Sequence, residues 1–235
     1  MASVRKSVWL LALTATVVAL VGLRIWMQRD RPADLDAPSC ADGPTVPGID
    51  VSYHQDKIEW AKVKRAGIRF AFIRVSDGLA VDDPMFAKNW ANARANKIAR
   101  GAYQFFRPED NAIAQADKMI AALARDKGEL PPVIDVEVTG GLRPAQVAKQ
   151  ITVWVDRVRA RLDVEPIVYT SPDFWRDSVG GADLSAQPLW VAHYTKGCPR
   201  VPAPWTRWSF WQYSKTGRVP GIRGNVDLNV YQGEL

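Results

Sequence analysis

The sequence predicts an α/β protein, a (β/α) barrel whose later helices are reduced, preceded by one N-terminal transmembrane or signal helix. Eight short apolar segments alternate with amphipathic segments after residue 47. These segments are apolar almost throughout, which is typical of parallel strands that are buried on both faces. The N-terminal helix is predicted from residues 7–23, which carry no charge.

The N-terminal segment is predicted to be a membrane address. Arg5 and Lys6 precede the uncharged run of 17 residues. A membrane span needs about 20 apolar residues, whereas the core of a cleavable signal has about 7–15. Because no small-residue cleavage site follows, we expect residues 1–28 to be an uncleaved signal anchor, with a cleaved signal peptide as the alternative. The domain that follows would then lie in the cell envelope outside the cytoplasm, or be secreted after cleavage.

Residues 29–46 are polar and rich in proline, which predicts a linker before a domain at 47–235. The two cysteines, Cys40 and Cys198, follow an export signal, so we expect them to form a disulfide; two free thiols are the alternative. Neither cysteine has metal-ligand spacing, and His54 and His193 are the only histidines. We therefore expect neither a metal nor another cofactor.

The composition is that of an ordinary globular protein, and the net charge of the chain is +6. This excess of basic residues is too diffuse to name a partner. No basic helix, zinc finger or aromatic RNA-binding motif is present, so we do not expect nucleic acid as a partner. We expect the chain to act as a monomer.

The strands of the barrel are predicted in order along the chain. They fall at 48–53, 68–76, 98–106, 132–138, 166–171, 188–194, 208–214 and 226–231. Helices are predicted after the first four strands, at 58–67, 84–97, 112–128 and 144–162. The last of these helices has apolar residues at helical spacing, namely Val147, Ile151, Trp154, Val155 and Val158. The later connections are short and rich in Pro, Gly and Trp, which predicts reduced helices there.

Four acidic residues interrupt the apolar strands, and a carboxylate is rarely buried without a partner or a task. They are Asp50, Asp135, Glu137 and Asp227. Asp135 and Glu137 are two residues apart on one strand, so their side chains point to the same face. Mutual repulsion would keep a proton on one of them, and an acid beside a carboxylate can cleave a glycosidic bond. A structural ion pair and a divalent-metal site are the alternatives.

Aromatic residues suggest a groove for sugar rings, which stack on aromatic faces. We expect Trp60, Trp90 and Trp154, at helical positions, to pack in the core. The candidates for the groove lie within predicted strands: Tyr103, Tyr169, Trp190, Tyr194 and Trp211.

Eight motifs between residues 47 and 232 resemble glycoside hydrolase family 25, the lysozymes that act as N-acetylmuramidases. The motifs are GIDVSYHQ, FAFIRVSDG, GAYQFFRP, PPVIDVEV, VYTSPDFW, LWVAHY, FWQYS and VDLNVY. The resemblance implies a flattened barrel with reduced C-terminal helices. It also implies hydrolysis of the β-1,4 bond between N-acetylmuramic acid and N-acetylglucosamine, with peptidoglycan strands as the partner.

The resemblance also implies roles for individual residues. Glu137 matches the proton donor of the family. Asp135 matches the carboxylate that orients the 2-acetamido group of the substrate or stabilises the transition state. Asp50 and Asp227 match the remaining carboxylates of the cleft, and Tyr103 matches a groove tyrosine. The spacing does not separate inversion from substrate-assisted attack by the acetamido group.

The chain departs from the family pattern at two positions. Gln104, a candidate substrate-binding residue, stands where the family usually has histidine, and Asp77 stands where it usually has glutamate. Both departures bear on substrate preference and rate. Besides a muramidase, the sequence allows a degenerate glycan-binding or scaffolding module, or a barrel that acts on a different polysaccharide.

Overall fold

The computed structural model describes residues 40, 43–180 and 182–235. The predicted anchor at 1–28 and most of the predicted linker at 29–46 lie outside these residues. Within the described part of the chain, no helix has the length and apolar character needed to cross a membrane.

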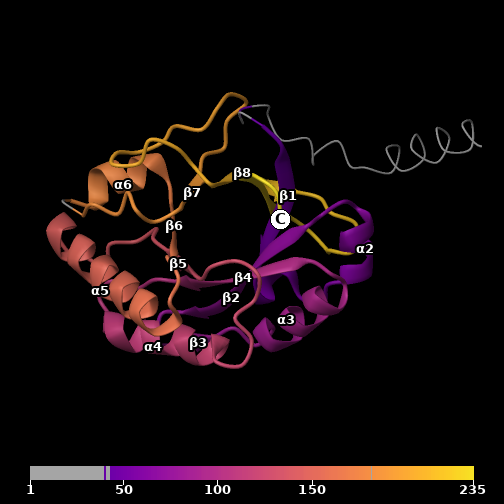
Figure 1. Ribbon diagram of the computed structural model, residues 1–235, viewed down its shortest axis with the longest axis horizontal. Helices are drawn as coiled ribbons and strands as arrows, with labels where there is room; N and C mark the ends of the chain where they lie inside the picture. The colour runs from indigo at the N-terminus through magenta and orange to yellow at the C-terminus, as the bar shows by residue number, and fades with distance from the viewer. Residues whose placement is uncertain (1–39, 41–42, 181) are drawn as a thin grey trace, which may run out of the picture. The chain divides into compact units, whose positions relative to one another are not determined.

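The strands form a closed barrel (Figure 1). The order of neighbouring strands is β1-β9-β8-β7-β6-β5-β4-β2, and the pairing of β1 with β2 closes the ring. All eight predicted strands are present, and a short strand, β3, is added at the edge of β2. The bounds are β1 Thr45–Val51, β2 Phe70–Asp77, β3 Val81–Asp82, β4 Ala99–Phe105, β5 Val133–Asp135, β6 Ile167–Thr170, β7 Leu189–Ala192, β8 Phe210–Gly217 and β9 Val226–Gln232.

The prediction of an all-parallel sheet was wrong for one strand of the barrel. Strand β9 runs antiparallel to both of its neighbours, β8 and β1. Only residues 218–225 join β8 to β9, and a parallel connection needs a crossover of about a dozen residues or more. As a result the N-terminal end of β9 meets the C-terminal end of β1, and Asp227 pairs in register with Asp50.

The four predicted helices are present outside the strands, as Figure 1 shows for α3, α4 and α5. Two helical elements were not predicted: the 3₁₀ turn η2 and the helix α6, whose first turn is capped by Ser171 and begins with Pro172. No helix follows β7 or β8 in the described residues, in line with the predicted reduction. The bounds are η2 Tyr53–Gln55, α2 Trp60–Arg65, α3 Phe86–Ala95, α4 Ala112–Leu123, α5 Pro144–Leu162 and α6 Pro172–Ser178.

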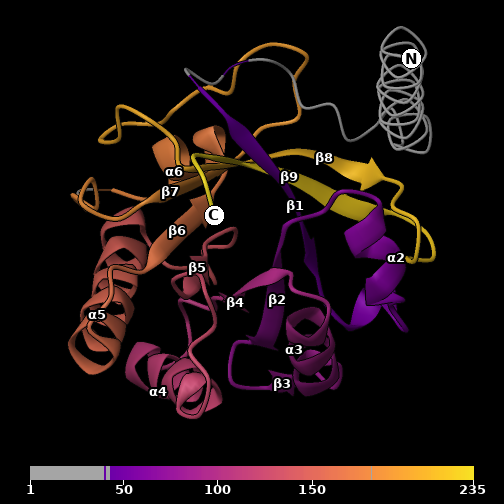
Figure 2. The same ribbon diagram turned by 45° about the vertical axis from the view of Figure 1, so that its right-hand side comes forward.

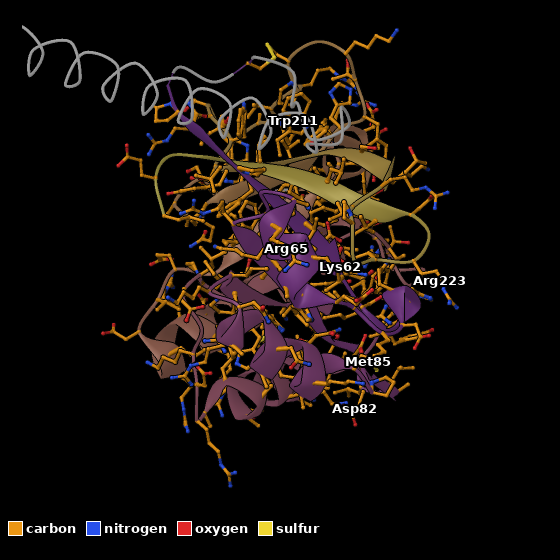
Figure 3. All side chains as sticks on the ribbon, turned by 90° about the vertical axis from the view of Figure 1, so that its right-hand side faces the viewer. Lys62, Arg65, Asp82, Met85, Trp211 and Arg223 are labelled. Atoms are coloured by element: carbon orange, nitrogen blue, oxygen red, sulfur yellow. A yellow bond between two sulfur atoms is a disulfide. The ribbon has the colours of Figure 1, made fainter. Side chains whose placement is uncertain are left out.

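Helix α2 illustrates how the outer helices are placed. Trp60 and Val63 are buried against the strands, whereas Lys62 and Arg65 lie on the outer surface (Figure 3). Apolar residues three apart share one face of a helix, so burial of that face leaves the charged residues in water. Helix α5 follows the same rule, and its five predicted apolar positions are all buried.

Alternating residues of β2 enter two different cores, one inside the barrel and one between the strands and the outer helices. Helices α3, α4 and α5 lie outside the strands in Figure 2. Phe70 and Phe72 of β2 point inward, and Ala71 and Ile73 point to the outer core. The inner core has room for the Phe70 ring because its neighbour across the sheet is Gly48, where a Cβ atom would collide with that ring.

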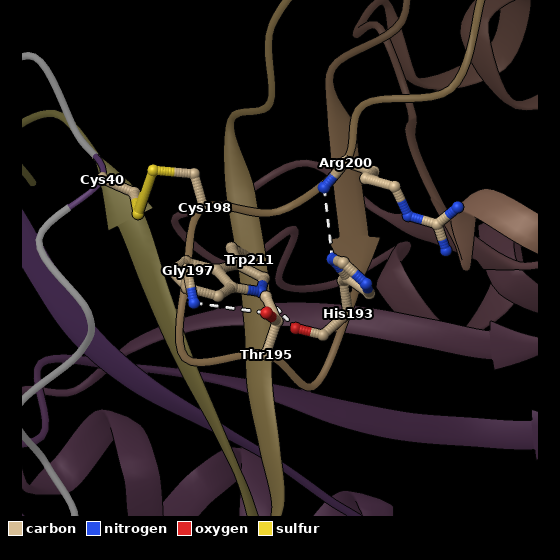
Figure 4. Close-up of a disulfide and its surroundings, with 7 residues drawn as sticks. All are labelled: Cys40, His193, Thr195, Gly197, Cys198, Arg200 and Trp211. Carbon is tan, nitrogen blue, oxygen red and sulfur yellow. Dashed lines mark hydrogen bonds between the residues drawn. A yellow bond between two sulfur atoms is a disulfide. The ribbon is translucent and has the colours of Figure 1, made fainter.

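The predicted disulfide between Cys40 and Cys198 is present, with Cα atoms 5.2 Å apart (Figure 4). It attaches residue 40 to the loop that follows β7. Hydrogen bonds also hold this loop: Arg200 N donates to Nδ1 of His193 at 3.2 Å, and the indole of Trp211 donates to the His193 carbonyl at 2.8 Å. The disulfide therefore connects the N-terminal segment to a loop with a defined conformation.

Candidate active site

The four predicted carboxylates line one pocket at the end of the barrel, with a volume of about 310 Å³. Asp50 comes from the end of β1, Asp135 from the end of β5, and Asp227 from the start of β9. Glu137 lies two residues beyond β5, which is shorter than the predicted strand. The complete lining is Asp50, Tyr103, Phe105, Asp135, Glu137, Tyr169, Trp190, Tyr194, Gln212, Lys215 and Asp227.

Asp50 is buried at the bottom of this pocket and is held by two side-chain amides. Its Oδ2 atom accepts hydrogen bonds from Asn229 at 2.8 Å and from Gln212 at 2.9 Å. Burial, followed by the charge of Asp227, raises the pKa of Asp50 well above its usual value, and the two amides partly oppose this shift. Burial likewise raises the pKa of Asp227, to which the charge of Glu137 adds. Asp50 and Asp227 thus form a strongly interacting pair.

Asp135 and Glu137 form the second pair of carboxyl groups. Asp135 is buried and its Oδ1 atom has no hydrogen-bond partner in the described structure, whereas Glu137 is exposed. Burial, the charge of Glu137 and a hydrogen bond between the two groups raise the pKa of Asp135 well above its usual value. The cation of Arg74 opposes this shift. Asp135 therefore retains its proton to higher pH than an ordinary aspartate would.

Gln212 and Asn229 are functional candidates that the sequence analysis missed. The Oε1 atom of Gln212 accepts from the hydroxyl groups of Tyr169, at 2.9 Å, and Tyr194, at 2.7 Å. Asn229 accepts from the indole of Trp190 at 2.9 Å. Because the oxygen of each amide is taken by these donors, its NH₂ group must face Asp50, which fixes the direction of every hydrogen bond in the network. In the sequence, the signal that could have identified them was an amide residue within an apolar strand. Both amides are buried in the structure, and a buried amide needs hydrogen-bond partners.

Aromatic side chains form the floor and walls of the pocket. The Trp190 ring stacks on Phe72, with centroids 4.4 Å apart, and contacts the edge of Tyr169 at 4.5 Å. Tyr103 meets Trp190 edge to face at 6.5 Å. Burial, with the charges of nearby carboxylates, raises the pKa of Tyr103 and of Tyr169, so both remain hydrogen-bond donors. Tyr194 is half exposed at the mouth.

Two predicted substrate-binding residues do not line the pocket. Gln104 is fully buried in the outer layer, where it accepts from the Trp154 indole at 2.7 Å and donates to Ser76 at 2.8 Å. Trp211 is also fully buried in the outer core. Both alternate with inward-facing neighbours, Tyr103 and Gln212, so strand geometry directs them away from the pocket. We therefore reassign Gln104 and Trp211 from substrate binding to structural roles.

Asp77, the other departure from the family pattern, holds an arginine at the rim. The guanidinium of Arg107 donates to the Asp77 carboxylate at 2.6 and 2.9 Å. The same guanidinium lies 4.6 Å from the centroid of the Phe105 ring, which lines the pocket. Asp77 therefore acts on the pocket indirectly, by fixing the arginine that covers Phe105.

A second lobe of about 490 Å³ continues from the first pocket between β6, β7 and α6. The two lobes share Glu137, Tyr169, Tyr194 and Lys215. The remaining lining of the second lobe is Ser171, Pro172, Asp173, Ala192 and His193. The cleft therefore continues past Glu137.

In the described residues, no group of three or more His, Cys, Asp or Glu side chains has the arrangement needed to hold a metal ion.

Comparison with known proteins identifies relatives. Residues 49–222 match the family model of glycosyl hydrolases family 25. The chain is 37% identical over 225 residues to lysozyme M1 of Streptomyces globisporus, covering 91% of this chain and 76% of that protein. It is 30% identical to the N,O-diacetylmuramidase of Chalaropsis sp, covering 78% and 96%. The crystal structure of a lysozyme from Streptomyces coelicolor superimposes with a TM-score of 0.74 at 36% identity, covering 82% and 94%.

Proposed function

Because the chain belongs to glycosyl hydrolases family 25 and is a glycoside hydrolase, we propose that its substrate is peptidoglycan. In this proposal it cleaves the β-1,4 bond between N-acetylmuramic acid and N-acetylglucosamine, and Glu137 is the general acid. The relatives named as lysozymes and as an N,O-diacetylmuramidase support a muramidase. The position of Glu137 supports its role.

The observation that carries this role is that Glu137 lines both lobes of the cleft, whereas Asp50, Asp135 and Asp227 line the first lobe. A glycan strand that fills both lobes places the bond between two sugars at their junction. A general acid must lie within hydrogen-bond reach of the oxygen it protonates. Glu137 is the carboxyl group at this junction, and its exposure leaves it open to the substrate.

Asp135 supplies the second carboxyl function in this proposal. Burial and the charge of Glu137 raise the pKa of Asp135, and the proposed acid step begins with a proton on Glu137. When the proton passes to the bridging oxygen, the carbon–oxygen bond breaks and both carboxylates are left charged beside the developing oxocarbenium ion. The partnerless Oδ1 of Asp135 is available to accept the N–H of the 2-acetamido group. Water then adds its hydroxyl to the anomeric carbon and returns a proton to the carboxylates.

We propose that Asp50 and Asp227 complete the negative surroundings of the sugar that occupies the first lobe, with Tyr103, Tyr169 and Trp190 as the aromatic surface beside it. Fixed dipoles that face a developing charge stabilise it without reorganisation. Gln212 and Asn229 keep Asp50 in place throughout the reaction. The pocket is therefore suited to a positively charged transition state.

The proposed substrate and the disulfide support an activity outside the cytoplasm, because disulfides persist in oxidising compartments. The signal anchor or signal peptide at 1–28 remains a prediction from the sequence, as do the domain boundaries and the monomeric state.

The Glu137→Gln variant tests the acid role. It keeps the shape of the side chain and removes the transferable proton, so we expect the release of muropeptides from peptidoglycan to fall by about 10²–10⁴-fold or more. Mass analysis of the digest should find muramic acid at the reducing ends. The matched control is Glu59→Gln on the exposed surface beside α2, which should leave the rate unchanged.

Full activity of Glu137→Gln would remove this residue from the acid role. Glycan binding by the wild-type protein without any product would instead favour the non-catalytic module.

A further inference from the structure

Lys215 is a cation in a cleft that five carboxylates line: Asp50, Asp135, Glu137, Asp173 and Asp227. It lies on β8 and lines both lobes, as Glu137 does. Its ammonium group is 5.4 Å from the centroid of the Tyr194 ring. The Tyr194 hydroxyl is bonded to Gln212 at 2.7 Å, so the ring that supports the lysine is itself held in place. The charge is therefore presented at the junction of the lobes, next to the proposed acid.

The charge of Lys215 faces the Tyr194 ring and acts on Asp227 from a distance, but within the described residues no salt bridge neutralises it. In the described part of the chain, no carboxylate lies within ion-pair distance of its ammonium group. The other cations beside the second lobe are already neutralised: Arg200 and Arg176 contact Asp173 at 2.7 and 2.9 Å. Lys215 is thus the cation of the cleft that remains available to a ligand.

We propose that Lys215 is a specificity-determining residue that pairs with a carboxylate carried by the muramic-acid substituent of the glycan. This inference rests on the proposed function and names the substrate class: strands with anionic substituents, in preference to neutral polymers of N-acetylglucosamine. Muramic acid differs from glucosamine by a 3-O-lactyl ether. Its carboxyl group is free in peptide-free strands, and in peptide-bearing strands the attached peptide supplies carboxylates.

A cation at this place also counters a penalty that the cleft imposes. The carboxylates at the pocket repel an anionic substrate, and this repulsion is strong where water is excluded. A lysine at the junction offsets the repulsion where the substituent projects, and a neutral substrate gains nothing from it. Discrimination therefore arises from the charge of the ligand.

Binding to a catalytically disabled protein tests the inference without requiring turnover. The dissociation constants of Glu137→Gln and of Glu137→Gln/Lys215→Gln are measured by calorimetry in the full chain. The three ligands are peptide-free strands, the same strands with the lactyl carboxylates converted to methylamides, and peptide-bearing strands with their peptide carboxylates amidated. We expect Lys215→Gln to weaken binding of the free-carboxylate strands by about three- to ten-fold, and this loss to shrink at high salt.

Matched variants separate the effect of a positive charge at the cleft from the effect of the overall charge of the protein. Lys88→Gln removes an exposed lysine of α3 and should leave all three affinities unchanged. Lys215→Arg keeps the cation and should restore most of the affinity for the free-carboxylate strands. In the active protein, Lys215→Gln should raise KM for these strands and leave kcat within about two-fold.

If Lys215→Gln weakened the binding of charged and of methylamidated strands by the same factor, the proposal would be overturned, because the lysine would then act through packing. A shifted pH profile of kcat with unchanged affinities would also overturn it and assign Lys215 to the tuning of Asp227, whose pKa it lowers. Peptide-bearing strands with amidated carboxylates should bind as weakly as the methylamides. Absence of any turnover by the wild-type protein would reject the hydrolase but leave these binding comparisons valid.

Discussion

Two uncharged residues, Gln212 and Asn229, organise the acidic pocket. Their amides are fully enclosed and each has one orientation that satisfies all its neighbours, with the oxygen toward aromatic donors and the nitrogen toward Asp50. An aspartate at either position would place a further carboxylate beside Asp50 and would have no NH₂ group to donate to it. An amide is therefore the group that fits both sides of the network.

Gln104 gives a prediction about stability. In Gln104→Leu the Trp154 indole and the Ser76 hydroxyl lose their buried partner, and we expect the free energy of unfolding to fall by about 2–4 kcal/mol. Because Gln104 lies outside the cleft, KM for peptidoglycan should not change. Thermal unfolding and steady-state assays check both parts. A large rise in KM with unchanged stability would return Gln104 to the substrate site.

Asp135 gives a prediction about pH. Its pKa is raised in the folded protein, so above pH about 4 the unfolded chain gives up this proton more readily, and stability falls as the pH rises toward the folded pKa. Asp135→Asn removes this charge. We expect the variant to be more stable than the wild type at pH 7, by about 0.5–2 kcal/mol, and to lose this advantage near pH 3.5.

Denaturant unfolding at the two pH values measures the difference for Asp135→Asn. The variant should also lose most of its activity, because the proposed reaction needs a carboxyl group there. An advantage that is equal at both pH values would show that burial does not shift the Asp135 proton.

At the scale of elements, Arg100 joins β4 to the segment that follows α4. Its guanidinium is almost fully buried and contacts Asp126 and Glu129, each at 2.8 Å, while it packs over the Trp90 ring of α3. A buried cation needs such partners because desolvation would otherwise destabilise the fold. The cluster fixes the connection between the outer helices and the barrel.

Asp126→Asn tests this cluster. Its contacts with Arg100 lower the pKa of Asp126 to about 2, so its stabilising effect is complete above the unfolded pKa near 4 and is lost as the pH falls through about 2. We expect the variant to lose about 2 kcal/mol at pH 7 and progressively less below pH 4. Chemical unfolding at pH 7, 4 and 2.5 measures this trend. A loss independent of pH would assign the effect to packing.

At the scale of the whole molecule, the disulfide closes a loop of 158 residues in sequence separation. Such a bridge restricts the unfolded chain, and removing a native disulfide costs about 2–5 kcal/mol. We therefore expect Cys40→Ser and Cys198→Ser to lower the melting temperature by similar amounts, and the double variant to lose no more than either single variant. A non-reducing gel and a thermal melt, with and without reductant, provide the measurement.

The antiparallel strand β9 shapes the molecule as a whole. It closes the barrel between β8 and β1 and brings Asp227 opposite Asp50, although the two are separated by most of the domain in sequence. In a parallel orientation the second residue of β9 would lie at the opposite end of the barrel. The acidic pocket therefore depends on the direction of a single strand.

The sequence by itself determined the eight strands, the four long connections with helices and the four acidic positions within apolar segments. These features follow from local hydrophobic periodicity and from the cost of burying a charge, and both can be evaluated in a short window of residues. The helix α6 was not predicted because its seven residues are too few to show a helical period.

Only the tertiary structure decided that β9 runs against its neighbours, that Gln104 and Trp211 face the outer helices, and that Gln212 and Asn229 hold Asp50. A continuous apolar run indicates that a strand is buried on both faces, but it does not indicate which of its side chains point into the barrel. The direction of β9 and the partners of the amides depend on register between residues far apart in the chain, and that register is set by closure of the ring.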